Sequence, residues 1–219
     1  MISRYFIDED IPIVTGVETV KEVLEKMDDY RIRALPLVED NKLLAILEQD
    51  NLLNQHDDAT KIASLPLGVP DYVVANSHWY DAVAVLKKTK LDIVPVLNEE
   101  LTFLGCIKSR TLLDNFMSML CFNSKGAILV LYVDIRLYSL ADIARIIESN
   151  GAKILSAALF QENNDDKTYL TLKLDIDDVS RVVAGLERFN YIIEARFQHS
   201  YFQNADQDRL NQLFRYINI

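Results

Sequence analysis

The feature that most constrains the fold is an internal repeat in the first half of the chain. Residues 17–53 align with residues 76–113, and the alignment places Pro36 on Pro95. A unit of this size would expose an apolar sheet face if it stood alone, and packing two such units against each other buries both faces. The repeat therefore predicts two similar units that share one core.

Each copy shows the same order of local patterns. In the first copy Thr19 is a natural N-cap with Glu22 three residues later, which is a capping box, and apolar residues follow at helical spacing. In the second copy Ser77 is the expected cap. Two short β runs joined by an acidic turn come next, ALPLV and LLAIL in one copy, IVPVL and FLGCI in the other. Each copy is thus predicted to fold as helix, strand, turn, strand, helix, over about residues 8–57 and 66–120 of a domain at residues 1–122.

The pattern changes after Asn123. Strand patterns and helix patterns follow in the order βαββαβ, and Ser139 is the expected cap of the first helix. This order predicts a ferredoxin-like domain over residues 123–200, in which two helices cover one face of an antiparallel sheet. Residues 201–219 predict a last helix, with an apolar stripe formed by Leu210, Leu213, Phe214 and Ile217. The predicted fold class is α+β, a mixed αβ chain.

The repeated unit resembles a pair of CBS domains, which together form a Bateman module. The resemblance rests on the run IRALPLV at Ile32–Val38, its echo LDIVPVL at Leu91–Leu97, and the strand pattern L-x-(A/G)-x-(I/L) that follows each run. The stretch VDIRLYSLADIARIIESNGAKI at Val133–Ile154 makes residues 126–198 resemble an ACT domain. The combination resembles stand-alone CBS–ACT proteins of the acetoin-utilisation-like type. Both resemblances imply regulatory ligand binding, and neither implies catalysis.

The CBS resemblance places a ligand at each corner where a strand enters a helix. There the family has a Ser or Thr that bonds phosphate and, three residues later, an Asp that holds the ribose hydroxyls, while the helix N-terminus faces the phosphate. These positions are Glu48 and Asn51 in the first copy, and Lys108 and Thr111 in the second. Glu48 would repel phosphate, so the first corner is expected to be mainly structural or a site for something non-anionic. Lys108 beside Arg110 favours an anion, so a nucleotide-like ligand is expected at the second corner. The alternative is that these two cations are solvated residues of a helix start.

The full set of expected cleft residues follows from the same resemblance. They lie at the two corners and along the proline-bearing strands of both copies. The set comprises Thr15, Ala34, Leu35, Pro36, Glu48, Asn51, Val74, Ile93, Val94, Pro95, Lys108, Ser109, Arg110 and Thr111.

The ACT resemblance implies a second candidate site in the loop after the first strand of that domain. The family has a glycine there, because a bound amino acid must approach the backbone N–H groups closely. In this chain the position is Tyr138, whose ring would fill the space, and Arg136 could pair with a carboxylate. The alternative is that Tyr138 packs at an interface and Arg136 is exposed. The candidate residues of this loop are Arg136, Tyr138 and Ser139.

Composition and missing motifs exclude several function classes. The chain has 33 acidic and 23 basic residues, a formal net charge of −10, so neither nucleic acid nor a membrane surface is an expected partner. No apolar run reaches about 18 residues, the length that suggests a membrane span, and the first ten residues lack a signal-peptide pattern. We therefore expect a cytoplasmic protein, with Cys106 and Cys121 as free thiols. Three scattered histidines, His56, His78 and His199, provide no metal spacing, and no catalytic motif is present, so we expect neither a metal site nor an enzyme.

Two functional hypotheses follow from these patterns. The first is a regulatory protein in which the CBS pair binds an effector, with AMP, ATP or S-adenosylmethionine as the regulatory ligands that the resemblance implies, and thereby changes the geometry of a dimer or of a partner protein. The second is a ligand-free dimeric assembly module, because the Ser/Thr-x-x-Asp pair and the loop glycine are both lost. A homodimer is expected in either case, since a second copy would cover open sheet edges and helix faces. Any other protein partner is unspecified.

Overall fold

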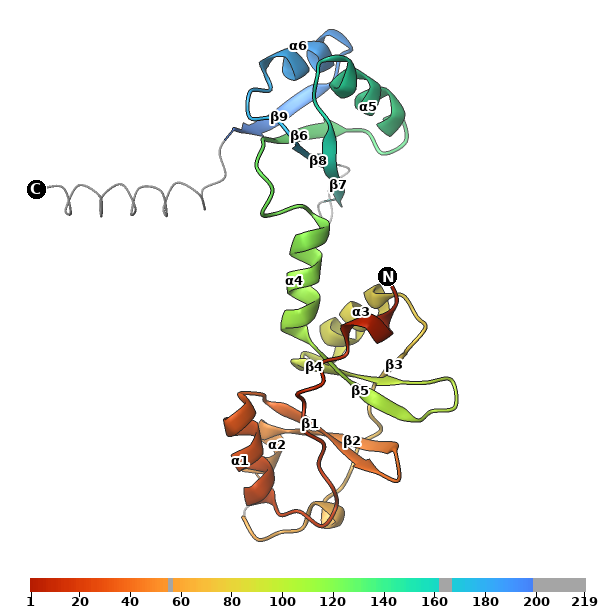
Figure 1. Ribbon diagram of the computed structural model, residues 1–219, viewed down its shortest axis with the longest axis vertical. Helices are drawn as coiled ribbons and strands as arrows, with labels where there is room; N and C mark the ends of the chain where they lie inside the picture. The colour runs from red at the N-terminus through yellow and green to blue at the C-terminus, as the bar shows by residue number, and fades with distance from the viewer. Residues whose placement is uncertain (55–56, 162–166, 199–219) are drawn as a thin grey trace, which may run out of the picture. The chain divides into compact units, whose positions relative to one another are not determined.

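The computed structural model describes residues 1–54, 57–161 and 167–198 (Figure 1). It divides into two compact units, Met1–Asn115 and Phe116–Ile219. The predicted turn at 163–166 and the predicted last helix at 201–219 lie outside the described residues, as do His56 and His199. No helix in the described part of the chain is long and apolar enough to cross a membrane.

The first copy of the repeat has the predicted order of elements. A short helix η1 (Ser3–Phe6) precedes it, and the copy then contains α1 (Val20–Tyr30), β1 (Ala34–Glu39), β2 (Lys42–Glu48), α2 (Gln49–Leu53) and η2 (Ile62–Ser64). The predicted capping box is present, because the Thr19 hydroxyl accepts the Glu22 N–H and the Glu22 carboxylate accepts the Thr19 N–H at 2.7 Å.

The second copy repeats this order, with one local difference at its first helix. It contains β3 (Val73–Val74), α3 (Trp79–Thr89), β4 (Ile93–Leu97), β5 (Phe103–Lys108) and α4 (Ser109–Met119). The prediction that Ser77 caps α3 is wrong, since the N-cap is His78, whose Nδ1 accepts the Tyr80 N–H at 3.3 Å. Ser77 instead contacts η1, because its carbonyl accepts the Ser3 N–H at 2.9 Å.

Strand pairing confirms that the two copies are equivalent. β1 pairs antiparallel with β2, and β4 pairs antiparallel with β5. β3 runs parallel to β4, and the parallel bridge between Val14 and Leu37 takes the same place in the first copy. Pro95 lies opposite Cys106 and precedes the two residues that β3 pairs with, so the proline, which has no N–H, stands where β4 has a single partner strand.

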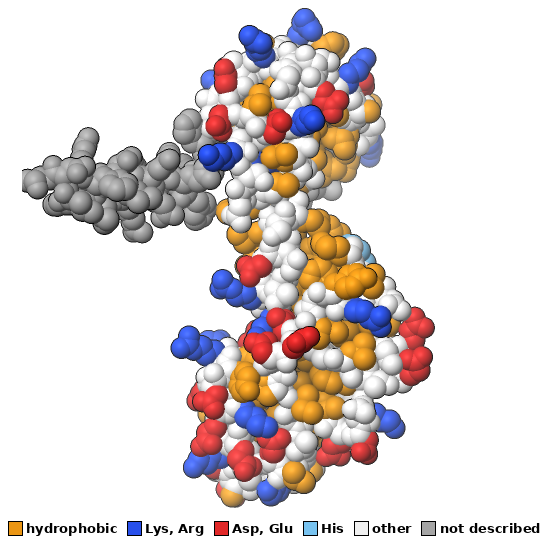
Figure 2. All heavy atoms as spheres, in the orientation of Figure 1, with side chains coloured by type: hydrophobic (Ala, Val, Ile, Leu, Met, Phe, Trp, Pro, Cys, Tyr) orange, Lys and Arg blue, Asp and Glu red, His pale blue; other side chains and the backbone are white. Residues whose placement is uncertain are grey.

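The two copies share a hydrophobic core, as the repeat predicts. Ile93 and Cys106 from the second copy are buried in one cluster with Leu35, Leu37 and Ile62 from the first. A second cluster forms around Trp79 and includes Phe6, which the segment before the first copy contributes. Figure 2 shows further hydrophobic side chains gathered on the visible face of this unit, with charged side chains toward its periphery. Fully burying a large aliphatic side chain is worth about 1.5–3 kcal/mol, so the shared core holds the copies together.

The second unit has the predicted ferredoxin-like topology. Its elements are β6 (Ile128–Val133), α5 (Leu140–Ser149), β7 (Ile154–Gln161), β8 (Thr168–Leu174), α6 (Ser180–Arg188) and β9 (Ile192–Phe197). The strands form one antiparallel sheet in the order β7-β8-β6-β9. Ser139 caps α5 as predicted, with its hydroxyl accepting the Asp142 N–H at 3.2 Å, and α5 ends before Gly151, whose φ is +84°.

Candidate ligand cleft

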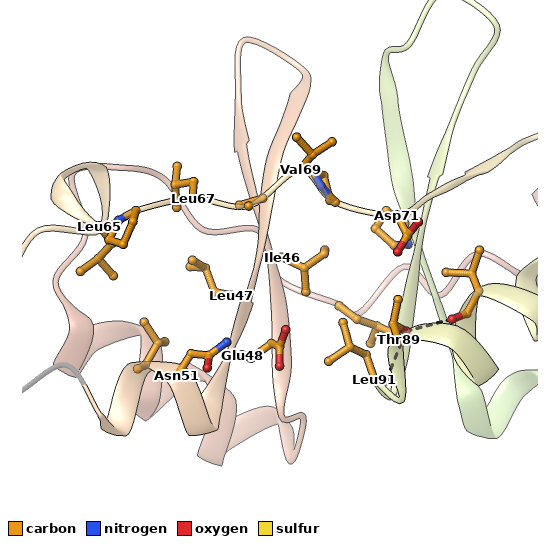
Figure 3. A pocket seen from close by; sticks show the side chains of 18 residues that line it. Ile46, Leu47, Glu48, Asn51, Leu65, Leu67, Val69, Asp71, Thr89 and Leu91 are labelled. Atoms are coloured by element: carbon orange, nitrogen blue, oxygen red, sulfur yellow. Dashed lines mark hydrogen bonds between the residues drawn. The ribbon is translucent and has the colours of Figure 1, made fainter.

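A cleft of about 320 Å³ opens within the unit Met1–Asn115, a size at the lower end of small-molecule sites. One wall is formed where β2 enters α2, a second by the end of α3 and by β4, and a third by the segment Leu65–Asp71 that joins the copies (Figure 3). The lining residues are Ala45, Ile46, Leu47, Glu48, Asn51, Leu52, Leu65, Pro66, Leu67, Gly68, Val69, Pro70, Asp71, Val85, Thr89, Leu91, Ile93 and Pro95.

Polar groups stand at the rim of this mostly apolar cleft. Figure 3 shows Glu48 and Asn51 at the α2 side, opposite Leu67 and Val69. Asp71 is neutralised, because Lys88 Nζ lies 2.6 Å from its carboxylate. Glu48 is half-buried, and no group in the described ranges pairs with its carboxylate. A carboxylate in this position favours a ligand that brings a positive charge or N–H donors.

Four of the residues expected from the family resemblance lie together in this cleft. They are Glu48, Asn51, Ile93 and Pro95. Five other expected residues do not line the cleft, because they belong to strands β1, β3 and β4 and pack or pair there. These residues are Ala34, Leu35, Pro36, Val74 and Val94.

Thr15 belongs to a separate polar cluster in front of α1. Its backbone N–H and its hydroxyl donate to the Glu18 carboxylate at 2.8 and 3.2 Å, and Lys26 donates to the same carboxylate. Burial acts to raise the pKa of Glu18, but the hydrogen bonds from Lys26 and Thr15 outweigh it and hold the pKa below its ordinary value. Thr15 therefore orders the start of the first helix and does not line the cleft.

The second corner is occupied by the chain's own Asp8. The Lys108 N–H donates to Asp8 Oδ2 at 2.7 Å, and the Thr111 hydroxyl donates to the same carboxylate at 2.8 and 3.0 Å. This carboxylate lies at the N-terminus of α4, where an anion is stabilised by the free N–H groups and the helix dipole. It takes the position in which the family resemblance places a phosphate.

The cations of the second corner are also paired within the chain. Lys108 Nζ lies 2.8 and 2.7 Å from the two Asp10 oxygens, and this hydrogen bond holds the pKa of Asp10 below its ordinary value. Arg110 is exposed and lies 3.6 Å from Asp114. Ser109 donates its N–H to the Asp92 carbonyl at 2.7 Å. The charges that suggested an anion site are thus largely neutralised.

The two corners differ because of the segment that leads into each copy. These segments are equivalent, since Ile2 bridges His78 just as Lys61 bridges Thr19. At the second corner Asp8 donates its N–H to the Cys106 carbonyl at 2.9 Å, which brings the first segment against β5. At the first corner the segment Leu65–Asp71 stands off from β2 and leaves the cleft open.

The two corners also differ in the residue on the strand beneath them, which is Gly105 at the second corner and Ala45 at the first. The repeat aligns Gly105 with Ala45, and Ile7 Cγ2 lies 2.6 Å from the place where a Cβ on Gly105 would be. Ile7 therefore fills the space above β5, whereas Ala45 lines the open cleft. Sequence reasoning missed both leading segments, although the run PLGVP at residues 66–70 signals a backbone that cannot pair regularly with β2.

Cys106, whose carbonyl accepts the Asp8 N–H, is buried beside the second corner. Burial, with a smaller contribution from the nearby Asp8 carboxylate, raises the pKa of the Cys106 thiol well above its usual range. A thiol that stays protonated is a poor nucleophile. Within the described ranges no three His, Cys, Asp or Glu side chains gather as a metal site.

The candidate loop of the second unit lies before α5. Tyr138 is half-buried and packs against the core of that unit. The Arg136 N–H donates to the Asp134 carboxylate at 2.8 Å, and its side chain is exposed. Ser139 serves as the helix cap. All three residues thus have structural contacts of their own.

Comparison with known proteins finds one family model and several solved structures that are similar to this chain. Residues 2–56 match the family model described as CBS domain. A CBS domain pair/ACT domain protein from Thermotoga maritima is 20% identical, with a TM-score of 0.50, over 55% of this chain and 99% of that one. At this identity the likeness shows the fold alone. No curated protein matches the chain.

Two further solved structures have lower scores. One is named as an acetoin utilization protein of Vibrio cholerae, 19% identical with a TM-score of 0.49 over 56% of this chain and 95% of that chain. The other is CBSX2 in complex with AMP, 18% identical with a TM-score of 0.47 over 53% of this chain and 96% of that chain. The family model thus covers the first copy, and the Thermotoga maritima structure shows that the chain shares the fold of a CBS domain pair protein over 55% of its length.

Proposed function

We propose that this chain is a regulatory protein in which the CBS pair senses one small molecule, bound in the cleft beside Glu48. The observation that carries the proposal is an open, mostly apolar cleft with a half-buried carboxylate that has no partner among the described residues. CBS domains are regulatory modules, and a cleft of this size suits a nucleoside better than a macromolecule. No catalytic role is proposed.

The chemistry of the rim selects among the adenine ligands that the family resemblance implies. Glu48 stands where the family has a hydroxyl for phosphate, so AMP and ATP would bring like charges together. Two unit charges at 4 Å interact by about 4 kcal/mol at an effective dielectric constant near 20, as an upper guide. We therefore propose that S-adenosylmethionine, with its sulfonium and amino cations, or uncharged adenosine binds more tightly than AMP or ATP.

The cleft also supports a regulatory consequence. Its walls come from the first copy, from the second copy and from the segment that joins them. A ligand that contacts all three walls shifts the equilibrium between two conformations of the unit, and the size of the shift is set by the difference in its affinity for the two conformations. We propose that this balance alters how two copies of the chain, or the chain and a protein partner, fit together in the cytoplasm.

Calorimetric titration of the full chain with S-adenosylmethionine, adenosine, AMP and ATP tests the proposal. The variant Glu48→Gln keeps the shape of the side chain and removes its charge, so it should weaken S-adenosylmethionine and strengthen AMP by about tenfold each, which corresponds to about 1.4 kcal/mol. Glu25→Gln, an exposed change on α1, is the matched control. Absence of binding by all four compounds would contradict the sensing function.

The second candidate is a ligand-free dimeric assembly module. Two observations favour it, the self-filled corner at Asp8 and the packed Tyr138 in the loop of the proposed ACT-type domain. The apolar side chains in Figure 2 offer a surface for a second copy. Light scattering separates the two functions, because an assembly module keeps the same dimer with and without every compound tested above.

A further inference from the structure

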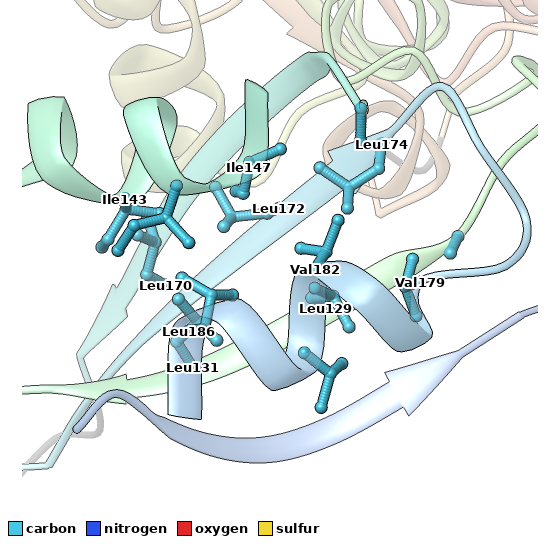
Figure 4. Packing of buried hydrophobic residues seen from close by; sticks show 14 of the residues in the cluster. Leu129, Leu131, Ile143, Ile147, Leu170, Leu172, Leu174, Val179, Val182 and Leu186 are labelled. Carbon is cyan, nitrogen blue, oxygen red and sulfur yellow. The ribbon is translucent and has the colours of Figure 1, made fainter. Parts of the chain in front are cut away.

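The sheet of the second unit has one covered face and one open face. On the covered face Ile143, Ile147, Val182 and Leu186 of the two helices pack against leucines of β6 and β8 (Figure 4). The residues in alternate register on the same strands point to the other face, because successive side chains of a strand alternate.

The open face is mostly apolar, with Ser156, Thr171 and Lys173 as its polar side chains. Strand register places its side chains in three rows across the sheet. Tyr132 and Tyr169 lie side by side in one row, with ring centroids 6.2 Å apart. The same row ends in Phe160 on β7 and Ile192 on β9, which are 60% and 56% exposed. A contiguous surface of this kind marks a place where something docks.

The chain itself covers one end of this face. The Ser156 hydroxyl donates to the Leu120 carbonyl at 2.8 Å, and Lys173 Nζ donates to the Gly126 carbonyl at 2.8 Å. These bonds hold residues 120–126 over the row that contains Ser156 and Lys173. The row of Phe160, Tyr169, Tyr132 and Ile192 keeps its two end side chains more than half exposed.

The segment that follows β9 has the pattern to cover the rest. Its sequence places Leu210, Leu213, Phe214 and Ile217 at i, i+3, i+4 and i+7, with polar residues between them. Sixteen residues, 204–219, would span about 24 Å as a helix, and four strands at about 4.8 Å spacing are narrower than that. Its acidic and basic side chains are balanced, with Asp206, Asp208, Arg209 and Arg215.

The link to the sheet is short enough to bring the segment back. Phe197 ends the edge strand β9 and is itself 53% exposed on the open face. Residues 198–203 can reach about 20 Å when extended. A tether of this length gives an effective concentration in the millimolar range, which exceeds the micromolar concentration of a second copy. We propose that residues 204–219 dock as an amphipathic helix on the open face of the sheet in the same chain.

Hydrogen exchange of the full chain tests the proposal, because a docked segment slows exchange in itself and in the strands beneath it. The double variant Leu213→Asp/Phe214→Asp should speed exchange at residues 204–219 and at the β9 edge at least tenfold, and should raise binding of an apolar dye several-fold. The matched control, Asn211→Asp/Gln212→Asp, adds the same charge to the polar face and should leave both unchanged.

A second variant and a dilution series complete the test. Phe160→Ser/Ile192→Ser changes exposed positions of the sheet and should release the segment to the same extent as the tail variant. Protection should be equal at 1 and 100 µM protein. Equal exchange in Leu213→Asp/Phe214→Asp and in its control would overturn the proposal. Protection that disappears on dilution would also overturn it, because the face would then bind residues 204–219 of a second copy.

Discussion

Replacing Asp8 by alanine removes the carboxylate that fills the second corner. Asp8 accepts the N–H of Lys108, the last residue of β5, and the hydroxyl of Thr111 in the first turn of α4. A hydrogen bond to a charged group contributes about 1.5–3 kcal/mol, and an anion at a helix N-terminus adds about 0.3–1 kcal/mol. We therefore expect Asp8→Ala to lower the free energy of unfolding by about 2 kcal/mol.

Urea unfolding followed by tryptophan fluorescence measures this loss. The chain has one tryptophan, Trp79, which is buried in the cluster that also contains Phe6. With a slope of about 2 kcal/mol/M for a unit of this size, the midpoint should fall by about 1 M. Asp10→Ala is the matched control, because it breaks an exposed pair with Lys108 worth about 0–1 kcal/mol.

The same variant should convert the corner into an anion site. Without Asp8, the Lys108 N–H and the Thr111 hydroxyl have no acceptor in the described part of the chain, and phosphate can replace the carboxylate. At ten times its dissociation constant, phosphate would raise the free energy of unfolding by about 1.4 kcal/mol. We expect this stabilisation in Asp8→Ala and not in the unchanged protein. Equal phosphate effects in both, or equal midpoints for Asp8→Ala and Asp10→Ala, would refute the reasoning.

Two further predictions concern the backbone of one unit and a carboxylate of the other. Gly126 has φ +121°, and an added Cβ would lie 1.9 Å from a backbone oxygen of β8, so Gly126→Ala should cost more than about 3 kcal/mol of stability. Gly151 has φ +84° and open space around it, so Gly151→Ala should cost about 1 kcal/mol. Equal midpoints in thermal melts of the two variants would contradict this prediction. Because the folded-state pKa of Glu18 lies below its ordinary value of 4.5, the stability it contributes is present above pH 4.5 and is lost as pH falls below it. Glu18→Gln, which removes the acceptor of Lys26, should reduce the loss of stability as pH falls below 4.5. An identical profile for Glu18→Gln and Glu25→Gln would show that the carboxylate is not linked to folding.

The order of elements could be predicted because its signals are local. Helical and alternating periodicity, the capping box at Thr19 and the repeated prolines each lie within one element. The error at the cap of α3 arose because serine was preferred as a cap over the residue that the repeat indicates. The alignment places Thr19 on His78, and α3 starts at Trp79 just as α1 starts at Val20.

The candidate site could be predicted only in part, because contacts between distant segments decide which corner is open. Glu48 and Asn51 were identified from the corner motif and line the cleft, together with Ile93 and Pro95. Nothing in the sequence near Lys108 indicates that Asp8 reaches it, since their pairing depends on the path of the whole first copy. Motif matching therefore placed a nucleotide-like ligand at the corner that the chain fills, and left the open corner to a structural role or a non-anionic ligand.

The duplication predicts two equivalent sites, and the leading segments remove that equivalence. Ile7 and Asp8 fill one corner by packing on Gly105 and bonding to Lys108, while the run PLGVP keeps the other segment away from β2. A ligand that binds in the proposed way should therefore saturate at one molecule per chain in calorimetric titration. Because Asp8→Ala leaves Ile7 packed on Gly105 and frees only the anion position, inorganic phosphate should gain a site in that variant, while adenosine should remain at one. A stoichiometry of two for adenosine in the unchanged protein would mean that Asp8 yields its place readily and that the two corners still act as a pair.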